Sequence, residues 1–461
     1  MRWIAPFVLL AIFFLLVRRQ VFTWPYYYDE ADYMYAASLG LHANYADAPA
    51  QSLFDFVRIG MSKGKGAVER AEMSREIRRS DDVNFYRHWH GPLYFYWLLA
   101  LAPFHLSEPA TRSWSYAFPV LTFLFIYAGS LWLLPGREGI LAGILGGAFY
   151  LWSYATIRTN EIAPHELFAS CYIVALLFLM KWRSTGAARY WNAALVASAG
   201  AFCTLEVAFV LVAVLLVCAA LATKLTDWRW MGKSALLFVG SVLMLWPGAV
   251  LKLSFLKAYL FMAYLALYRP SPWGRVSVLE TWRLRFTHSP VECLLVAGAV
   301  LAYFLFCDRP TRRALFPVLL YASLMLLVVL RVATDTPRYM LPFLPAFHLF
   351  AGLVFASILK GWKPLPQAVA ASAVCLLVLW NAAAQIAAHP ILPAPRLHAE
   401  LVKLGERHPE GKKLLVPQDD LPMIHYYFPG ANLWGYVDEQ EKTAWLTRER
   451  FDVVLQASGS E

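Results

Sequence analysis

Residues 26–33 read Tyr-Tyr-Tyr-Asp-Glu-Ala-Asp-Tyr and follow directly after the first hydrophobic segment of the chain. Three carboxylates stand among four tyrosines at the point where an apolar run gives way to a polar one. Tyr side chains concentrate at the boundary between lipid and water, so we expect this stretch at the level of the lipid headgroups. A carboxylate at that depth can touch water and a lipid headgroup at the same time.

Asp29 has two interpretations at this point. As a structural residue it would be the N-cap of a short helix, with Asp32 in the capping-box position three residues later. As a functional residue it would be a catalytic carboxylate at headgroup depth. The stretch by itself leaves both interpretations open.

The composition excludes an ordinary soluble protein. Of the 461 residues, 59% are hydrophobic and 16% are charged, with a mean hydropathy of +0.48, whereas soluble domains carry about 25% charged residues. The net charge of +10 arises from short basic groups between apolar runs, which is how membrane proteins mark their cytoplasmic loops. We therefore expect an integral membrane protein without a nucleic-acid partner. The six cysteines lie in or beside apolar runs without a metal-like spacing, which favours packing residues over disulfides or ligands.

The hydrophobic runs predict a polytopic all-α protein. The first run, Trp3 to about Val17, has no small-residue cleavage site after it, so we interpret it as a membrane anchor and not as a signal peptide. The run 190–222 is too long for one crossing and has basic groups on both flanks, so we split it at Glu206 into two short helices. The later predicted spans are 113–134, 138–157, 162–180, the two halves of 190–222, 234–251, 291–307, 314–332, 339–359 and 367–388.

Residues 91–106 decide the topology of the first loop. The apolar part is shorter than the roughly twenty residues that span a bilayer. If it crosses, the Asp29 loop is cytoplasmic; if it lies in the interface, the N-terminus is inside and that loop is outside. The basic stretch 58–79, which we predict to contain an exposed helix, favours the first choice slightly, but long loops follow the charge rule poorly.

The last seventy or so residues form a separate polar region in the sequence. Residues 412–416 and 452–455 are typical of strands, and helical stretches are expected near 421–428 and 441–450. We therefore divide the chain into a transmembrane domain, 1–388, with a first outer loop at 23–112, and a small extracytoplasmic α/β domain at 389–461.

Three further polar clusters fall on the face where this tail is expected. Arg112 stands just before the span 113–134, residues 158–166 join two spans, and Arg338 opens the span 339–359. A cation is unfavourable at a helix N-terminus, so Arg338 needs an anion nearby. That anion could be Asp335 or a bound ligand.

The order and spacing of these clusters resemble those of the GT-C membrane glycosyltransferases, specifically the branch of protein O-mannosyltransferases and lipid A aminoarabinose transferases. Asp29-Glu30 resembles their Asp-Glu pair at the start of the first outer loop. The stretch 90–94, His-Gly-Pro-Leu-Tyr, looks like their His-Pro-Pro-Leu-Tyr motif, with Gly91 in place of the first proline. Arg112 matches an arginine that opens their next span.

Two later motifs extend the resemblance over most of residues 20–360. Residues 158–165 are similar to an Arg-x-x-Glu-x-Arg-Pro-Tyr pattern, from which Ala163 and His165 depart. The stretch 338–342, Arg-Tyr-Met-Leu-Pro, resembles the Arg-Tyr-x-x-Pro start of a late span. In these relatives the acidic pair faces the outside, which implies about eleven crossings, an inside N-terminus and an outside tail. The implied location is the cytoplasmic (inner) membrane of a bacterium.

The resemblance also implies a reaction. The donor would be a sugar on a polyprenyl phosphate, and the acceptor would be a hydroxyl of an extracytoplasmic lipid, glycan or protein. A phosphate leaves readily, so one carboxylate suffices as general base, unlike the pair that glycoside hydrolysis needs. We assign Asp29 as the base, Glu30 as its orienting or acceptor-binding partner, and Arg338 with Arg112 as phosphate ligands.

Weaker candidates for contacts to the substrates are His90, Arg158, Glu161, His165 and Tyr339. No cofactor is required on this interpretation. A divalent metal (Mg, Mn or Zn) is optional, because no ligand spacing in the sequence demands one.

The sequence also allows three other functions. One is a lipid-linked oligosaccharide polymerase or ligase that uses pyrophosphate donors, and another is a polytopic transporter or flippase. Transporters usually place charges near the bilayer midplane, whereas the charges here fall mostly at span ends. A non-catalytic scaffold that presents the tail is a third.

Overall fold

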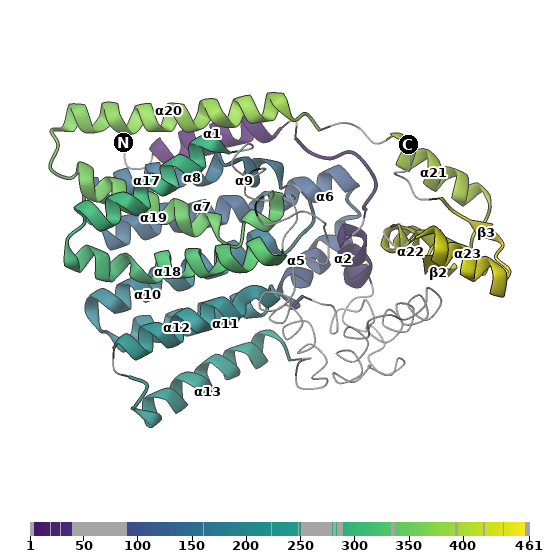
Figure 1. Cartoon of the computed structure of the whole chain (residues 1–461), viewed down its shortest axis with the longest axis horizontal. Helices are drawn as coiled ribbons and strands as arrows, with labels where there is room; N and C mark the ends of the chain where they lie inside the picture. The colour runs from purple at the N-terminus through teal and green to yellow at the C-terminus, as the bar shows by residue number, and fades with distance from the viewer. Residues whose placement is uncertain are drawn as a thin grey trace.

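A computed structural model of the chain describes residues 4–18, 20–27, 29–38, 90–159, 161–222, 224–247, 249, 279, 283, 289–332, 337–391, 395–417, 420–436 and 438–456. The helix predicted within 58–79 and the residue Asp335 lie outside these ranges. Most of the described residues belong to long helices that run side by side in a bundle (Figure 1). The bundle helices are α1 (Ile4–Val17), α6 (Glu108–Ser115), α7 (Ala117–Leu133), α8 (Arg137–Leu151), α10 (His165–Thr185), α11 (Ala188–Phe202), α12 (Phe209–Leu221), α13 (Trp228–Leu245), α17 (Pro290–Phe306), α18 (Arg309–Val332), α19 (Leu344–Leu359) and α20 (Pro364–Ala388).

Several of these helices have the length and apolar character of membrane spans. Four described stretches are long and apolar enough to cross a bilayer, and they are Glu108–Leu133, His165–Thr185, Arg309–Leu330 and Pro364–Ala388. Five more apolar helices are shorter, and they are Ile4–Val17, Leu93–Phe104, Glu206–Leu221, Pro290–Phe306 and Leu344–Leu359. On α20, Leu376 and Trp380 are 64% and 65% exposed. Such an apolar outer surface suits lipid and not water, so the chain is a membrane protein.

Close packing in the bundle depends on glycines at one helix crossing. A Cβ atom added to Gly352 of α19 would lie 2.6 Å from the backbone nitrogen of Gly146 in α8. Small residues let two helix backbones approach in this way, as is usual between membrane helices. The contact fixes α19, and with it the segment that precedes α19 at the end of the bundle.

Short elements gather at one end of the bundle (Figure 1). They are α2 (Asp29–Ser38), α5 (Leu93–Leu101), η2 (Ala102–Phe104), α9 (Tyr154–Arg158), η3 (Glu206–Ala208) and η5 (Pro337–Met340). The predicted break at Glu206 coincides with η3, a short turn between α11 and α12. Helix α5 packs against α2 at this end of the bundle.

Two predicted helix starts were wrong. The span expected from 339 begins as α19 only at Leu344, because Pro345 takes its place in the first turn of the helix. Arg338 therefore lies in the preceding 3₁₀ turn η5. The span expected from 113 instead begins with α6 at Glu108, so Arg112 lies inside a helix and not just ahead of one.

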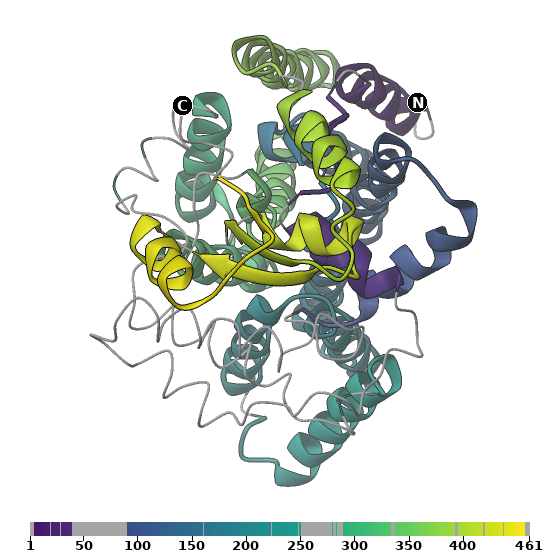
Figure 2. The ribbon, with the colours of Figure 1, turned by 90° about the vertical axis from the view of Figure 1, so that its right-hand side faces the viewer.

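The C-terminal elements form a small parallel sheet with helices around it. They are α21 (Pro395–Glu406), β1 (Lys413–Pro417), α22 (Leu421–Tyr427), β2 (Asn432–Tyr436), α23 (Glu439–Arg448) and β3 (Val453–Val454). The strand order is β2-β1-β3, with Leu415 of the central strand paired to Trp434 and Val454. Leu414, Leu415 and Val416 are fully buried, as a central parallel strand requires. Figure 2 shows these elements in front of the bundle end that carries α2.

Tyrosine contacts attach this C-terminal part to α2 and its approach. The hydroxyl of Tyr427 in α22 accepts from the backbone N–H of Tyr26 at 3.0 Å and donates to Glu108 Oε1 at 2.9 Å. Tyr27 donates to Asp420 Oδ1 at 3.2 Å. The C-terminal part therefore contacts the segment that leads into Asp29.

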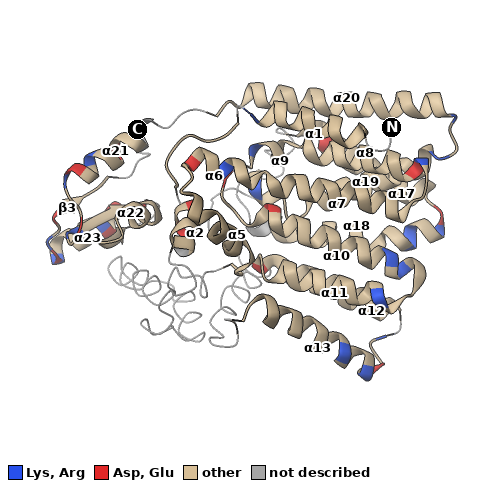
Figure 3. Ribbon diagram, turned by 180° about the vertical axis from the view of Figure 1, so that it is seen from behind, with Lys and Arg blue, Asp and Glu red and all other residues tan. Residues whose placement is uncertain are grey.

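The two ends of the bundle differ in their charged residues. Figure 3 shows Lys and Arg gathered at the end opposite the C-terminal elements, where α10, α12 and α19 end and α13, α18 and α20 begin. Lys360 and Glu138 form an ion pair there at 3.2 Å. Asp29, Glu30 and Arg338 lie at the other end, close to the C-terminal elements.

Candidate active site

Helix α2 starts with two acidic residues that face different arginines. The first turn carries Asp29 and Glu30, where the positive end of the helix dipole stabilises carboxylates. Successive residues point about 100° apart around a helix. Asp29 accordingly pairs with Arg338, and Glu30 pairs with Arg112.

The Arg112 guanidinium is fully buried, and all of its donors are used. Its Nε and Nη2 donate to the two carboxylate oxygens of Glu30 at 2.9 and 2.5 Å. The remaining hydrogens go to the carbonyl oxygens of Phe22, Trp24 and Pro25 at 3.0, 2.7 and 3.2 Å. A guanidinium has five N–H donors, so none is left for a phosphate. In this arrangement Arg112 ties the segment before α2 to α6.

Glu30 is closed to substrate in the same way. Besides Arg112, its Oε1 accepts the backbone N–H of Ile162 at 2.8 Å, and the residue is 5% exposed. Ile162 stands in the loop between α9 and α10, next to Glu161. Glu30 therefore joins the start of α2 to the loop that carries Glu161.

The Arg338 guanidinium forms a more open cluster. It donates to Asp29 Oδ2, and its Nη1 donates to Glu161 Oε2 at 2.9 Å. The side chains of Asp29 and Glu161 are 32% and 25% exposed, while Arg338 is 9% exposed. Within the residues that the structure describes, the buried Nε of Arg338 has no hydrogen-bond partner. A cation with a spare donor thus lies beside two carboxylates that solvent can reach.

The electrostatics of this cluster follow from burial and from the shared arginine. Burial raises the pKa of Glu161, with Arg338 opposing the shift and Glu30 and Asp29 adding to it. Burial alone would lower the pKa of Arg338, but Asp29 and Glu161 outweigh burial and raise that pKa well above its usual value. The arginine therefore stays charged.

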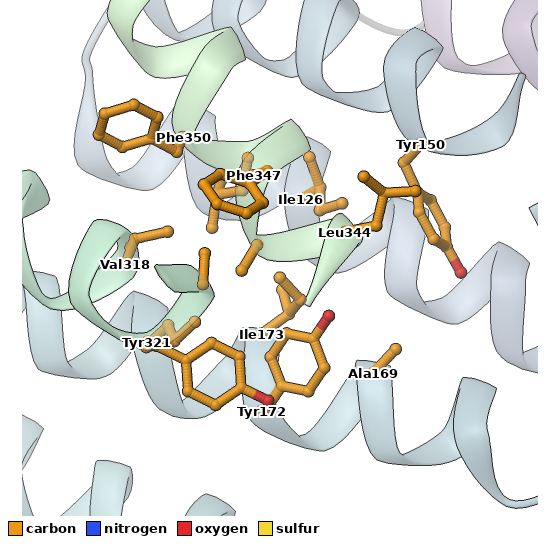
Figure 4. Close-up of a cluster of buried hydrophobic side chains, with 14 of the residues drawn as sticks. Ile126, Tyr150, Ala169, Tyr172, Ile173, Val318, Tyr321, Leu344, Phe347 and Phe350 are labelled. Carbon is orange, nitrogen blue, oxygen red and sulfur yellow. The ribbon is translucent and has the colours of Figure 1, made fainter. Parts of the chain in front are cut away.

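Two tyrosines of the core hold the segment that carries Arg338. Tyr172 of α10 donates to the carbonyl oxygen of Leu341 at 2.8 Å, and Tyr321 of α18 donates to that of Pro342 at 2.9 Å. Figure 4 shows both tyrosines next to each other in the apolar cluster around α19. They satisfy carbonyls that the irregular backbone between η5 and α19 would otherwise leave unpaired.

His90 lies in a second polar group beside the Arg338 cluster. Its Nδ1 is 2.6 Å from Glu206 Oε2, and its Nε2 is 2.9 Å from the hydroxyl of Tyr33. Tyr33 lies one turn after Asp29 on α2, so both side chains fall on one face of that helix. The predicted substrate contact from His90 thus has both ring nitrogens engaged by protein groups.

The remaining predicted residues lie around these groups. His165, the first residue of α10, is buried, and its ring meets that of Tyr339 edge-on at 5.5 Å. The Arg338 guanidinium lies 5.2 Å from the Tyr339 ring. Arg158 donates to Gln20 Oε1 at 3.1 Å and lies over the Tyr154 ring, so its described contacts are outside the carboxylate cluster.

Sequence reasoning missed Glu206 and Tyr33 as members of the site. Glu206 was predicted only as the point that divides a long apolar run. A lone carboxylate in such a run is itself a functional signal. The signal for Tyr33 was its position four residues after Asp29, which places both on one helix face.

The donor set does not suit a metal in this arrangement. Arg338 lies between Asp29 and Glu161 and donates to both carboxylates. Among the described residues, no group of three or more His, Cys, Asp or Glu side chains is placed to hold a metal. The geometry fits an anion better than a divalent cation.

Comparisons with known proteins agree on the fold. Neither a protein-family model nor a curated protein sequence matches the chain. Among solved structures, ArnT from Cupriavidus metallidurans in the apo state superimposes with a TM-score of 0.58 at 14% identity, covering 97% of this chain and 88% of that one. The same protein bound to undecaprenyl phosphate gives a TM-score of 0.56 at 14% identity, covering 96% and 87%.

A second protein with this fold is the oligosaccharyltransferase AglB from Archaeoglobus fulgidus. Its complex with an inhibitory peptide and a dolichol-phosphate gives a TM-score of 0.57 at 11% identity. The match covers 95% of this chain but only 64% of AglB. Another structure of that enzyme is a complex with Zn and sulfate. The chain therefore has the fold of the GT-C membrane glycosyltransferases.

Proposed function

We propose that this protein is a membrane glycosyltransferase that moves a sugar from a polyprenyl-phosphate donor to a hydroxyl of an extracytoplasmic acceptor. The observation that carries the proposal is the open cluster of Arg338 between Asp29 and Glu161. It combines a partly exposed carboxylate with a charged arginine that retains a spare donor. Those are the two groups that transfer from a sugar phosphate needs.

In the proposed reaction the acceptor oxygen attacks the anomeric carbon of the sugar. The bond from that carbon to the phosphate oxygen breaks, and the polyprenyl phosphate leaves with the electron pair. The acceptor's proton passes to the carboxylate of Asp29. Arg338 stabilises the negative charge that grows on the phosphate.

The proposed roles of the other predicted residues follow from their contacts. Arg112 and Glu30 are positioning residues that fix the start of α2, because their polar groups are already paired. His165 and Tyr339 shape the site next to Arg338. Arg158, bound to Gln20, holds the end of α9 against the segment before α2.

The charge distribution supports a topology in which α2 and the C-terminal elements lie outside the cytoplasm. Basic residues at the opposite bundle end (Figure 3) are typical of the cytoplasmic side. We propose an inside N-terminus, about eleven crossings and an α/β domain outside the inner membrane of a bacterium. Single cysteines placed at Gly430 and at Gly64, which lies outside the described residues, should both react with an impermeant thiol reagent once the outer membrane is permeabilised. Labelling of Gly430→Cys alone would contradict this topology.

The function is tested directly by reconstitution. The purified protein in lipid vesicles receives a polyprenyl phosphate with a labelled sugar, together with membrane extracts that contain candidate acceptors. The proposal predicts transfer of the label with release of one polyprenyl phosphate for each sugar transferred. Transfer only from a pyrophosphate-linked oligosaccharide would support the polymerase or ligase alternative. Movement of intact labelled lipid between leaflets without cleavage would indicate a flippase.

A further inference from the structure

Glu206 is a buried carboxylate that the proposed reaction does not use. It lies in η3, between the apolar helices α11 and α12, and is 6% exposed. Burying a carboxylate is costly unless it is paired. The pairing partner is His90, 116 residues away in the sequence, at 2.6 Å.

A glycine makes this pairing sterically feasible. A Cβ atom on Gly91 would lie 2.1 Å from the carbonyl oxygen of Cys203, which is backbone and cannot rotate away. The same carbonyl accepts the backbone N–H of Leu93 at 3.1 Å. The start of α5 is thereby docked directly on the turn that leads to Glu206. Gly91 stands where the motif that this stretch resembles has its first proline. The lack of a Cβ atom at Gly91 allows the close approach.

The hydrogen bonds of His90 give Tyr33 two states. If the imidazole is neutral and its Nδ1–H donates to Glu206, then Nε2 accepts the O–H of Tyr33, and that proton is directed toward His90. If the imidazole is protonated, Nε2–H donates to the Tyr33 oxygen. The Tyr33 O–H is then directed away from His90.

We propose that Glu206 and His90 are a positioning pair that turns the Tyr33 hydroxyl toward the donor phosphate held at Arg338. The inference rests on the proposed function, because it needs a phosphate at that arginine. Tyr33 is suited to the role, since it lies on the Asp29 face of α2. Burial raises the pKa of its phenol well above the usual value, so the hydroxyl keeps its proton and remains a donor.

The charge on His90 depends on the groups that surround it. Glu206 faces it from η3, Tyr33 and Asp29 from α2, Arg338 from η5 and His165 from α10. Burial lowers the pKa of the imidazole, but Glu206, with a smaller contribution from Asp29, raises it above the usual value overall. The protonated state therefore persists to higher pH than in a free histidine. It is lost as the pH rises through this raised pKa.

The test measures binding of a sugar-free polyprenyl phosphate to the protein in nanodiscs as a function of pH. The wild type should bind tightly at low pH and more weakly above a pH limit that is set by the deprotonation of His90. Glu206→Gln should move that limit to lower pH. Tyr33→Phe should weaken binding roughly tenfold below the limit, as loss of a hydrogen bond to a charged group predicts, and should remove the limit.

A second carboxylate–histidine pair supplies a matched control. In the bundle, His348 Nε2 and Glu292 Oε1 lie 2.5 Å apart, and neither residue belongs to the candidate site. Glu292→Gln should leave the pH limit unchanged. Thermal unfolding of each variant reports on folding, and the position of the pH limit reports on His90 even if Glu206→Gln lowers stability.

The outcomes separate this inference from the function on which it rests. If the wild type binds no polyprenyl phosphate at any pH, the proposed function fails. If it binds, but Glu206→Gln leaves the pH limit in place and Tyr33→Phe binds normally, only the positioning pair is refuted. A limit that moves equally in Glu206→Gln and Glu292→Gln also contradicts the inference, because it would reflect the fold and not His90.

Discussion

Asp29 and Glu30 are neighbours in α2, and each carboxylate pairs with a different arginine. The two pairs differ in whether polar groups remain accessible to a ligand. The Arg112–Glu30 pair is sealed, because five donors meet five acceptors within the protein. The Arg338–Asp29 pair is partly exposed and shares its arginine with Glu161. The same chemical pair therefore has two uses, and hydrogen-bond completeness distinguishes them better than burial or charge.

The comparison teaches how one short turn can carry a sealed contact and an open one side by side. Glu30 anchors the start of α2 to α6 through Arg112 and to the next loop through Ile162. Asp29, one residue earlier, is thereby held in place by contacts other than those of its own carboxylate, which pairs with Arg338. The Asp29 side chain is partly exposed to solvent and contacts Arg338.

The largest effect is expected from breaking the sealed pair. Arg112→Ala leaves Glu30 buried without its cation and strips three carbonyls of their donor. Removing one partner of a buried ion pair costs about 3–5 kcal/mol, so most of the folded protein should be lost. Yield and thermal unfolding in detergent measure this. An Arg112→Ala variant that unfolds like the wild type would contradict the structural role of the pair.

The open pair should respond in binding and not in folding. Arg338→Ala removes a charge-assisted contact, so affinity for a polyprenyl phosphate should fall roughly 10- to 100-fold. Its thermal stability should fall much less than that of Arg112→Ala. Arg338→Lys should recover part of the affinity, because lysine keeps the charge but loses the forked geometry. Unchanged affinity together with a large loss of stability would make both arginines structural.

A smaller effect is expected where the C-terminal part contacts this turn. Tyr427→Phe removes the hydroxyl that joins the backbone of Tyr26 to Glu108. Each such hydrogen bond contributes about 0.5–1.5 kcal/mol, so the melting temperature should fall slightly while polyprenyl-phosphate affinity stays the same. If affinity fell as far as in Arg338→Ala, the Tyr427 contact would belong to the open, ligand-binding region and not to the structural one.

Much of the bundle could be predicted from the sequence, because apolar runs and basic groups are visible residue by residue. The break at Glu206 was predicted for that reason. The starts of α6 and α19 were misplaced, although Pro345 signals a first helical turn. Such signals are local. The predicted helix starts followed the first residues of the hydrophobic runs instead.

The two arginines show what the sequence could not reveal. The sequence predicted an anion near Arg338 and offered Asp335 as a local partner, yet the described partners, Asp29 and Glu161, are 309 and 177 residues away. Arg112 was assigned to phosphate because it matches an arginine of the resembling family. Nothing in the sequence indicates that its donors meet backbone carbonyls. The sequence indicated several of the residues near Arg338 but not Tyr33 or Glu206. Only tertiary geometry separates the sealed arginine from the open one.

The most direct test of the account is the transfer activity of Asp29→Asn. Asparagine keeps the size and the hydrogen-bonding oxygen, and as an N-cap it is about as good as aspartate, but it cannot take a proton. The account predicts that transfer falls by at least about 100-fold, with normal yield, melting temperature and polyprenyl-phosphate binding. A variant that keeps most of its transfer activity would show that Asp29 is not the base, and the open pair would lose its catalytic role.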